Sequence, residues 1–534
     1  MAERVIVRRG SYHDSARLMR IGRELSAVAG ITSADVIMGT PANIEMLAQA
    51  GFPRADLQGA TPMDMVVALR SDDRETFAAA EQRLATLLAG ATSEPKTADL
   101  ERRPGSVAEA VRSHPGANLV SIAVPGAYAA FVANRALDAG RNVFLFSDNV
   151  ALEDEVALKT RGCASGLLVM GPDCGTAIVA GVGLGFANRV PRGHVGIVGA
   201  SGTGTQEVCC LLSRLGVGVS HAIGTGSRDL STAVNGMMSE FALRLLAEDA
   251  ATRVVVLVAK HPAPEVADRL HGVLAGLGKP AVVRYLGEPA RVAADSVVYA
   301  ETLDEAAAVA AAVSGRATLH PGRATLQGCR VSGRLVGLFG GGSLAAEAQY
   351  VLATCGIDTT VPARPLVPGQ AIPGPPTLAS VPSELRRGHA VAARRVEGAA
   401  EAGTGHLIVD TGDDAYTVGR PHPMVDQIVR CGLVRAAGAD PAVGLILLDL
   451  VLGDGAHSDP APEIAAAVAD ARAARPEVPL AVVCSVCGST DDPQDVERQM
   501  AVLGAAGIHT TVTAAQAALL SAGLLGRSPE RSAR

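Results

Sequence analysis

The chain has 534 residues, of which 48% are hydrophobic, and it carries a net charge of −7 with an isoelectric point near 6.0. This length exceeds one compact core and predicts about three to five domains, while the apolar content excludes a mainly disordered protein. The acidic balance, the absence of a basic cluster and an aromatic content of 3% argue against nucleic acid as a partner. The 59 glycines predict many tight turns between strands and helices.

Nothing in the sequence predicts a membrane protein or a secreted one. The N-terminal residues MAERVIVRRG lack the apolar core of a signal peptide, and the longest apolar runs, 254–259 and 443–448, suit buried strands. Nine cysteines form no disulfide-like framework. Cys484 and Cys487 form a CxxC pair that is either two small residues at a strand end or half of a metal site. We expect a reduced, cytoplasmic protein without a metal.

Residues 1–90 predict a small α/β domain. A linker rich in Pro, Ser and Thr is expected at 91–116. The domain's predicted strands are 4–8, 34–38 and 63–69, and its predicted helices are 14–28, 42–50 and 73–88.

Residues 116–190 alternate between strands and helices and predict a parallel sheet with right-handed crossovers. Its last strand runs into the turn formed by residues 171–175. The predicted strands are 118–124, 142–146 and 167–170, and the predicted helices are 128–139 and 152–161.

The pattern then restarts twice, over 193–312 and 334–525, and predicts two copies of one doubly wound unit. A linker is expected at 313–333, and a long Pro- and Gly-rich loop at 361–404. In the first copy we predict strands at 195–198, 217–223, 254–259 and 281–285, and helices at 205–215, 230–248 and 263–277. In the second we predict strands at 335–339, 407–410, 443–450, 480–484 and 508–512, and helices at 344–355, 424–437, 460–474, 495–506 and 514–524.

Each copy has a Gly-rich turn between its first strand and first helix. In the first copy this turn is Gly199–Thr205, where Ser201, Gly202 and Thr203 are the candidate phosphate ligands. The second copy has Gly340–Ser343 in the same place, with Gly341, Gly342 and Ser343 as candidates. A helix start carries about half a positive charge and therefore favours phosphate or carboxylate. The alternative is an ordinary capped helix start, since the segment lacks the lysine of a nucleotide-binding loop.

Two further turns contain residues that are candidates for ligand binding or catalysis. Gly171, Pro172, Asp173 and Cys174 follow a strand at the edge where α/β sheets bind ligands; Cys174 is either a nucleophile or a buried thiol. In Gly419–Pro423, Arg420 can hold a carboxylate or phosphate and His422 can move a proton; the alternative is a surface turn. Asp449, Asp454 and His457, and likewise Lys260-His261, follow buried strands.

Several motifs resemble a known family. GPDCG, GHVGIVGASGTGTQEV, IGTGSRDLSTAVNGM and KPAVVRYLG look like the α subunit of succinyl-CoA synthetase, and AVPGAYAAFVANRALDAG resembles its CoA-binding domain. GLFGGGSLAAEA, LIVDTGDDAYTVGRPHPM and LILLDLVLGDGAHSDPAPEI resemble the ligase domain of the β subunit. Together with the N-terminal block, this fusion resembles the FdrA family.

The resemblance implies a CoA-binding-like Rossmann domain at 116–190, followed by flavodoxin-like ligase domains at 193–312 and 334–525. It implies that Ser201–Thr203 and Gly341–Ser343 hold phosphate, and that Pro125 and residues 171–174 contact CoA. It also implies a step in which an acyl group moves between phosphate and a thiol or amine.

Three features differ from that family, and they restrict the reactions that we expect. The segment GEPARVAADS lacks the family's phosphohistidine, Lys260 and His261 replace its supporting acidic residue, and no ATP-grasp domain is present. We therefore expect either an acyl-CoA synthetase-like subunit or a transferase that uses ready-made acyl or carbamoyl phosphate. FdrA-like proteins are associated with purine and allantoin breakdown, which makes a carbamoyltransferase that converts oxamate to oxalurate the alternative. A regulatory or scaffold subunit is the third reading, and partner subunits or a homo-oligomer are expected in each case.

Overall fold

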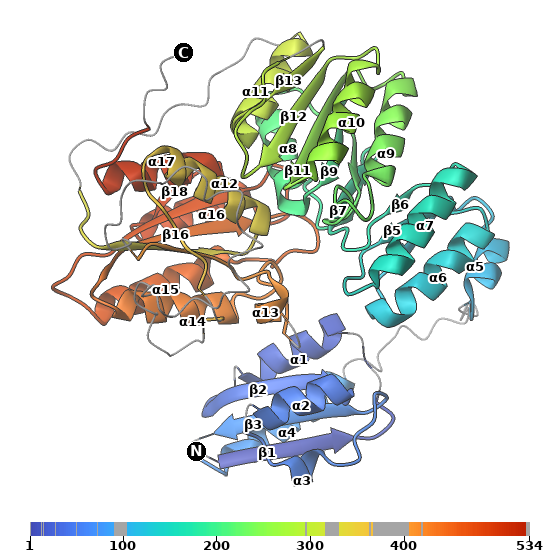
Figure 1. Cartoon of the computed structure of the whole chain (residues 1–534). Coiled ribbons are helices and arrows are strands. Elements are labelled where there is room, and N and C mark those ends of the chain that lie inside the picture. The colour runs from blue at the N-terminus through green and yellow to red at the C-terminus, as the bar shows by residue number, and fades with distance from the viewer. Residues whose placement is uncertain are drawn as a thin grey trace. The chain divides into compact units, whose positions relative to one another are not determined.

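The computed structural model describes residues 2–11, 13, 15–26, 28–49, 51–71, 73–89, 104–293, 296–315, 330–362, 365–366, 405–417 and 420–529. The chain divides into two compact units. The first contains Met1–Arg103 together with Thr417–Pro421, and the second contains Pro104–Tyr416 and His422–Arg534 (Figure 1). Most of the segments predicted as linkers or as the long loop, 91–103, 316–329 and 367–404, lie outside the described residues.

The N-terminal unit is the small α/β domain that the sequence predicted. Its three strands form an antiparallel sheet in the order β1-β3-β2, and Leu18, Leu25, Met65 and Leu84 lie in its core. The elements are β1 (Ala2–Arg8), α1 (Ser15–Ser26), β2 (Ile31–Met38), α2 (Pro41–Gln49), α3 (Arg54–Leu57), β3 (Met65–Ser71) and α4 (Thr76–Ala89).

The larger unit begins with a small parallel sheet in the order β4-β5-β6. The prediction of a linker over 104–116 was wrong, because this stretch contains a helix, α5. Ser106 accepts a hydrogen bond from the N–H of Glu109, and Glu109 accepts one from Gly105 in return, which is a capping box. The elements are α5 (Val107–Ser113), β4 (Leu119–Ile122), α6 (Gly126–Asp138), β5 (Asn142–Leu145), α7 (Leu152–Ser165) and β6 (Val169–Met170).

A seven-stranded sheet follows, in the order β13-β12-β11-β9-β10-β7-β8. The hairpin of β7 and β8 lies within the predicted domain 116–190, but it pairs with β10 of this sheet. Helix α9 is shorter than predicted, since residues 226–236 form a loop in which Asn235 and Gly236 have positive φ. The elements are β7 (Thr176–Val179), β8 (Val182–Gly185), β9 (Arg192–Ala200), α8 (Gly202–Arg214), β10 (Val219–Gly224), α9 (Met237–Glu248), β11 (Val254–Lys260), α10 (Pro264–Ala275), β12 (Ala281–Leu286), β13 (Val297–Tyr299) and α11 (Leu303–Val313).

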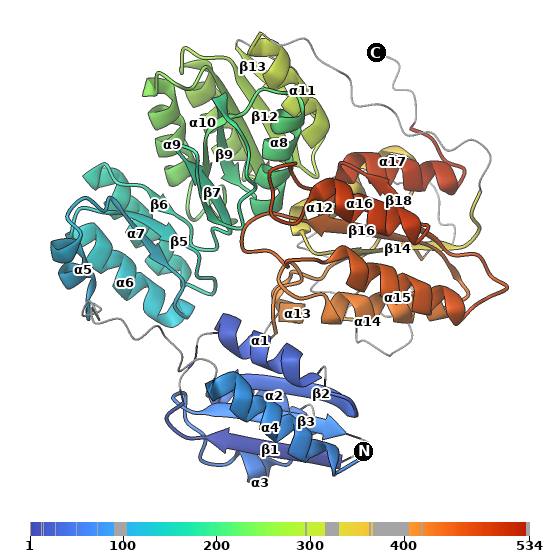
Figure 2. The ribbon, with the colours of Figure 1, turned by 180° about the vertical axis from the view of Figure 1, so that it is seen from behind.

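The last domain has a five-stranded parallel sheet in the order β15-β14-β16-β17-β18. Strands β9 to β13 follow the same order relative to their own sequence, so the predicted pair of doubly wound domains is confirmed. Figure 2 shows both domains from behind. The elements are β14 (Arg334–Phe339), α12 (Gly342–Thr354), β15 (Leu407–Asp410), α13 (Asp414–Thr417), α14 (Ile428–Ala439), β16 (Val443–Val451), α15 (Ala461–Ala473), β17 (Ala481–Cys487), α16 (Val496–Ala505), β18 (His509–Thr511) and α17 (Ala514–Leu524).

The two repeated domains share one hydrophobic core. Helices α8 and α11 of the first and α12 and α17 of the second contribute to it, while α9 with α10, and α14 with α15 and α16, pack in separate cores. Among the described residues, no helix is long and apolar enough to cross a membrane.

Two buried glutamates, one from each repeated domain, make equivalent hydrogen bonds across this shared core. Glu347 of α12 accepts a hydrogen bond from the N–H of Leu303, the first residue of α11, at 2.6 Å. Glu207 of α8 accepts one from Ala514, the first residue of α17, at 3.1 Å. Each helix thus caps the last helix of the other domain, which fixes the two domains' leading helices against each other.

Candidate functional site

The starts of α8 and α12 meet. Each helix follows a parallel strand, β9 or β14, through a Gly-rich turn at the carboxyl edge of its sheet. The Ser201 hydroxyl donates a hydrogen bond to the Ser343 hydroxyl at 2.7 Å, although 142 residues separate them. A Cβ on Gly341 would lie 2.8 Å from Thr203 Oγ1. The candidate phosphate ligands of both copies therefore face one another.

Both helix starts leave polar groups without partners. Within the described residues neither α8 nor α12 has a side-chain hydrogen bond at its N-cap, so the N–H groups of the first turns have no capping partner. The buried hydroxyl of Thr203, a residue that is 9% exposed, likewise lacks a described hydrogen-bond partner. Aligned peptide dipoles add positive potential at each start. This arrangement suits a bound oxyanion.

Gly342 sits at the most crowded point of the site. A Cβ there would lie 1.9 Å from Asp410 Oδ2 and 2.8 Å from Lys260 Nζ. Only a residue without a Cβ allows the carboxylate and the ammonium to approach the helix backbone this closely. The sequence identified the glycine as a turn residue, and the structure shows a second reason for it, which is close approach.

Asp410 and Lys260 are therefore members of the site. Asp410 ends β15 and accepts a hydrogen bond from the N–H of Gly412 at 2.9 Å. Burial raises the pKa of Asp410 to about 6, and the charge of Lys260 acts in the opposite direction. Lys260 ends β11. From the sequence, Lys260 was noted for its place after a buried strand and as a replacement for the acidic residue of the resembling family, and Asp410 had no predicted role.

The side chain of Asp449 is hydrogen-bonded to the backbone of the Gly-rich turn in the second copy. Its carboxylate accepts hydrogen bonds from the N–H groups of Gly340 at 2.6 Å and Gly341 at 2.8 Å, and from Arg430 at 2.6 Å. Burial raises the pKa of Asp449, and the Arg430 guanidinium opposes that rise. Asp454 and His457, predicted beside it, have other contacts: Asp454 pairs with Arg189 at 2.7 Å, and His457 lies 3.2 Å from Glu463.

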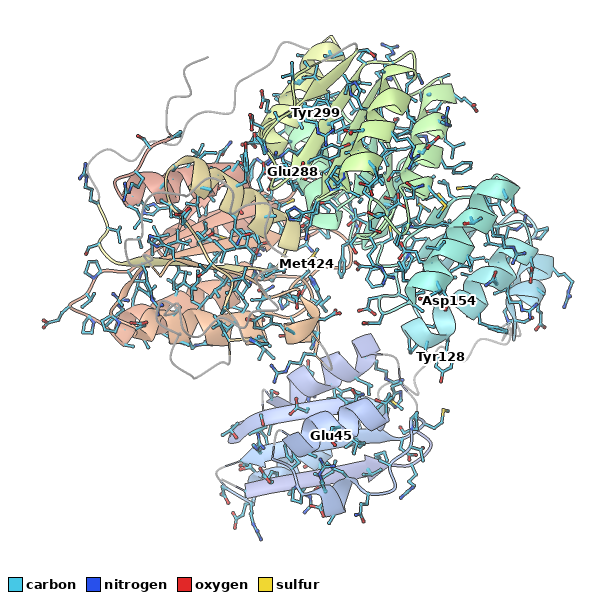
Figure 3. The ribbon with its side chains drawn as sticks, in the orientation of Figure 1. Glu45, Tyr128, Asp154, Glu288, Tyr299 and Met424 are labelled. Carbon is cyan, nitrogen blue, oxygen red and sulfur yellow. The ribbon has the colours of Figure 1, made fainter. Side chains whose placement is uncertain are left out.

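His422 lies against Gly412, the residue that also contacts Asp410. Its Nδ1 accepts a hydrogen bond from the N–H of Met424 at 3.1 Å, which places the proton of the neutral ring on Nε2. A Cβ on Gly412 would lie 2.6 Å from that Nε2. Burial, reinforced by Arg430, lowers the pKa of His422 to about 4. His422 is thus a neutral hydrogen-bond donor near pH 7. Figure 3 labels Met424, two residues beyond it.

Arg420 is exposed and lies in Thr417–Pro421, which groups with the N-terminal unit. Its predicted contact with a carboxylate stays a prediction. The CxxC cysteines are buried in β17, and the Sγ atoms of Cys487 and Cys210 are 4.0 Å apart. No group of three or more potential metal ligands is found among the described residues.

The candidate CoA ligands share the carboxyl edge of the small sheet. Pro125 is the N-cap of α6, after β4, and residues 171–174 form a turn after β6. Asp173 has a positive φ and accepts a hydrogen bond from the Ser227 hydroxyl at 2.6 Å. Tyr128, in the first turn of α6, is 67% exposed at the same edge (Figure 3). It is a candidate ligand that the sequence analysis missed.

The side chain of Cys174 is not available as a nucleophile. It is 2% exposed, and burial raises its pKa to about 12. Since the thiolate is the reactive form, the reading as a buried thiol is the one that the structure favours. Any contact of Cys174 with a cofactor would involve its backbone.

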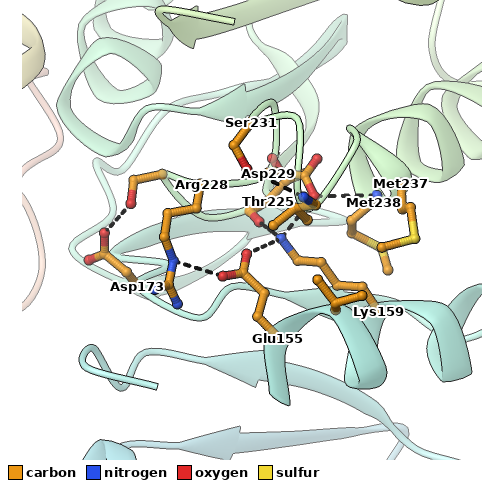
Figure 4. A network of polar contacts seen from close by, with 12 residues as sticks. Glu155, Lys159, Asp173, Thr225, Arg228, Asp229, Ser231, Met237 and Met238 are labelled. Atoms are coloured by element: carbon orange, nitrogen blue, oxygen red, sulfur yellow. Dashed lines mark hydrogen bonds and ion pairs between the residues drawn. The ribbon is translucent and has the colours of Figure 1, made fainter. Parts of the chain in front are cut away.

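A buried ionic network holds the loop that packs on this turn (Figure 4). Lys159 of α7 donates to Glu155, Asp229 and the carbonyl of Thr225, each at 2.8 Å. Arg228 donates to the other oxygen of Glu155. Because these charges are paired and hydrogen-bonded, burial does not leave any of them isolated. The network fixes residues 225–229 beside the Gly171–Asp173 turn.

Three family models match this chain. Residues 1–104 match a family described as "AllF, heavy metal-associated domain", residues 191–284 a "CoA binding domain" and residues 338–524 a "CoA-ligase". The CoA-binding match covers the first repeated domain, not the block at 116–190 to which the sequence analysis gave that role. Residues 1–104 contain no cysteine. Within their described part, no group of three or more potential metal ligands is found.

A relative in Escherichia coli (strain K12), YahF, is 33% identical over 545 residues, which cover 98% of each chain. The chain belongs to the family of YahF. YahF itself is described as uncharacterized. A succinate–CoA ligase α subunit of Archaeoglobus fulgidus is 34% identical over 157 residues, which are 29% of this chain and 53% of that subunit. These matches support an acyl-CoA synthetase-like assignment, at the superfamily level, for the repeated domains of this YahF-family chain.

Solved structures give weaker likenesses. The dinucleotide-forming acetyl-coenzyme A synthetase 1 of Ca. Korarchaeum cryptofilum, in complex with phosphate and ADP, is 18% identical, with a TM-score of 0.32. That match covers 76% of this chain and 82% of the other. ATP citrate lyase of Methanothrix soehngenii is 19% identical, with a TM-score of 0.31, over 40% and 37% of the two chains.

Proposed function

We propose that the chain holds the phosphoryl group of an acyl phosphate between the starts of α8 and α12, as the catalytic subunit of an acyl-CoA synthetase-like enzyme. The observation that carries this proposal is the 2.7 Å contact between Ser201 and Ser343. It brings two uncapped helix starts together at one point. The family matches to CoA-binding and CoA-ligase domains support a thiol as the acceptor.

The chemistry at this point is a transfer of the acyl group. A new C–S bond to the thiol of CoA forms, the C–O bond to phosphate breaks, and the thiol proton passes to the departing phosphate. Negative charge develops on the leaving oxygens, where the two helix starts and Lys260 can stabilise it. His422, neutral near pH 7, can donate a hydrogen bond from Nε2 to the reacting carbonyl or phosphate.

The sequence favours a ready-made acyl phosphate over a phosphate carried on the protein. The stretch 287–296 has no histidine to carry a phosphoryl group, and a lysine stands at 260 where the resembling family has an acidic residue. The same site can therefore serve the alternative suggested by the FdrA resemblance. In that reaction the carbamoyl group of carbamoyl phosphate passes to the amide nitrogen of oxamate, and phosphate and oxalurate form. Arg420 is the residue that the sequence predicts to bind the carboxylate of oxamate.

The experiment measures phosphate release from acetyl phosphate and carbamoyl phosphate, by the full chain with its partner proteins. Each donor is tested alone, with CoA and with oxamate. We expect release that depends on CoA, and at least a fivefold loss in Thr203→Val, which removes one hydroxyl donor to a charged ligand. Thr160→Val, an exposed change on α7, is the matched control and should leave the rate unchanged.

The outcomes separate the three readings. Release that depends on oxamate but not on CoA would favour the carbamoyltransferase. Acceptor-dependent release by the assembly that is equal for the wild type and for Thr203→Val would contradict a catalytic phosphate site. That result would leave a regulatory or scaffold role for the chain.

A further inference from the structure

Lysine is rare in this chain. Only four of the 47 Lys and Arg residues are lysines, at 96, 159, 260 and 279. Lys159 is held by two carboxylates and a carbonyl, and Lys279 donates to two carbonyls at 2.7 Å. Lys96 lies outside the described residues. In the described part of the chain, Lys260 is the lysine whose ammonium has neither a hydrogen bond nor an ion pair.

The surroundings of Lys260 show where its charge acts. Its Nζ approaches Gly342 at the start of α12, where Asp410 Oδ2 also lies. The charge of Lys260 lowers the pKa of Asp410 and of Asp173, while burial raises the pKa of both. Lys260 therefore faces one carboxyl group from the second repeated domain and one from the turn that follows the small sheet.

We propose that Lys260 is the cation that binds a dianionic oxyanion at the start of α12, and that Asp410 takes up a proton when this anion binds. The inference rests on the proposed function, and it names the class of ligand, a phosphoryl or similar dianion. Two helix starts supply about half a positive charge each, and Lys260 adds one more. About two positive charges match a dianion only when Asp410 is neutral.

Other titratable groups face Asp410 and must be separated from it. Asp413 follows on the same loop. Asp449 on β16 accepts hydrogen bonds from Arg430 and from two backbone N–H groups. His422 lies against Gly412, and burial lowers its pKa to about 4, which is below the pH range of the test. Across the site are Asp173, which is paired with Ser227, and His261, which packs on Gly287. Replacing Asp410 alone therefore isolates its contribution.

The test uses sulfate, which stays dianionic between pH 5.5 and 8, so only the protein changes charge. Isothermal titration calorimetry of the full chain in two buffers of different ionisation enthalpy gives both the affinity and the protons taken up. For the wild type at pH 7.5 we expect uptake of about one proton and an affinity about 20-fold weaker than at pH 5.5. Inorganic phosphate is the second probe.

The variants separate the two residues. Lys260→Met should weaken sulfate binding at pH 7.5 at least tenfold, and Lys260→Arg should restore part of it. Asp410→Asn should bind sulfate more tightly at pH 7.5 and take up no proton. Lys279→Met, which removes a lysine held by backbone carbonyls, should bind as the wild type does. Thermal unfolding of each variant checks that it is folded, and Lys260→Gln replaces Lys260→Met if the latter is not.

The failures of the two proposals are distinguishable. If the wild type binds neither sulfate nor phosphate, the proposed phosphate site itself is wrong. If the wild type binds sulfate and the folded Lys260 variants bind equally well, the role of Lys260 is overturned. If Asp410→Asn takes up as many protons as the wild type, the role of Asp410 is overturned.

Discussion

The starts of α8 and α12 occupy the same place in two copies of one fold, but their surroundings differ. At the start of α12 the buried carboxylate of Asp449 accepts the N–H groups of Gly340 and Gly341 and is neutralised by Arg430. At the start of α8, Val258 of the neighbouring strand lies beside the helix, 3.2 Å from where a Cβ of Gly204 would be. The turn before α12 is therefore hydrogen-bonded to a buried ion pair, whereas the start of α8 has an apolar side chain beside it.

This difference teaches that a Gly-rich turn before a helix is not by itself an anion site. Part of the second turn's hydrogen-bonding capacity is already used by Asp449. The capacity that remains for a ligand comes from the first turns of α8 and α12 and from Lys260, which reaches α12 from the other domain. The site is therefore complete only where the two copies meet.

The largest effect should come from breaking the internal pair at the start of α12. Asp449→Asn leaves the Arg430 guanidinium, which is 2% exposed, without its charge partner. Breaking one side of a buried ion pair costs about 3–5 kcal/mol, and we expect this loss in the free energy of unfolding measured in urea. Asp449→Asn combined with Arg430→Met should recover part of it. A loss below about 1 kcal/mol for Asp449→Asn would show that Asp449 does not hold the turn.

A second comparison concerns the glutamates that cross the shared core. Glu347 is paired with Arg284 at 2.7 Å, and Glu207 has no described cation beside it and one oxygen without a described partner. Burial raises the pKa of Glu207 well above its usual range, which favours its neutral form. Glu347→Gln should cost about 3 kcal/mol, because the Arg284 charge remains buried. Glu207→Gln should cost less than about 1 kcal/mol. Equal losses in urea unfolding would contradict this asymmetry.

The smallest effect concerns the first residue of each helix. Gly342→Ala would place a Cβ 1.9 Å from Asp410, whereas the nearest atom to a Cβ on Gly202 is 3.8 Å away. Overpacking typically costs about 1–3 kcal/mol, so Gly342→Ala should lower the melting temperature by several degrees. Gly202→Ala should leave it within about one degree. A reversed order of the two melting temperatures would contradict the close approach of Asp410 and Lys260 to α12.

The sequence predicted most of the fold, because the information is local. Periodic apolar residues and Gly-rich turns identified both repeated domains and the starts of α8 and α12. Two local errors have physical causes. The helix over 107–113 was hidden in a stretch rich in Pro and Ser, although the capping pair Ser106 and Glu109 was present. The loop before α9 follows from Asp229, which a lysine 70 residues away holds in place.

The candidate site could be predicted only in part, since its members are far apart along the chain. Ser201 and Ser343 were identified separately, but their contact depends on how the two domains pack. Asp410 gave no signal, because a carboxylate at the end of a strand is common. The role of Lys260 became visible only when the structure placed it beside Gly342 of the other domain.

The central claim is that one oxyanion binds where the two helix starts meet. The most direct measurement is a crystal structure of the full chain with selenate, whose anomalous scattering identifies the anion independently of water. We predict a peak within hydrogen-bonding distance of Ser201 Oγ, Thr203 Oγ1 and Lys260 Nζ, and its loss in crystals of Lys260→Met. Selenate bound elsewhere, with no peak between α8 and α12 at saturating concentration, would contradict it.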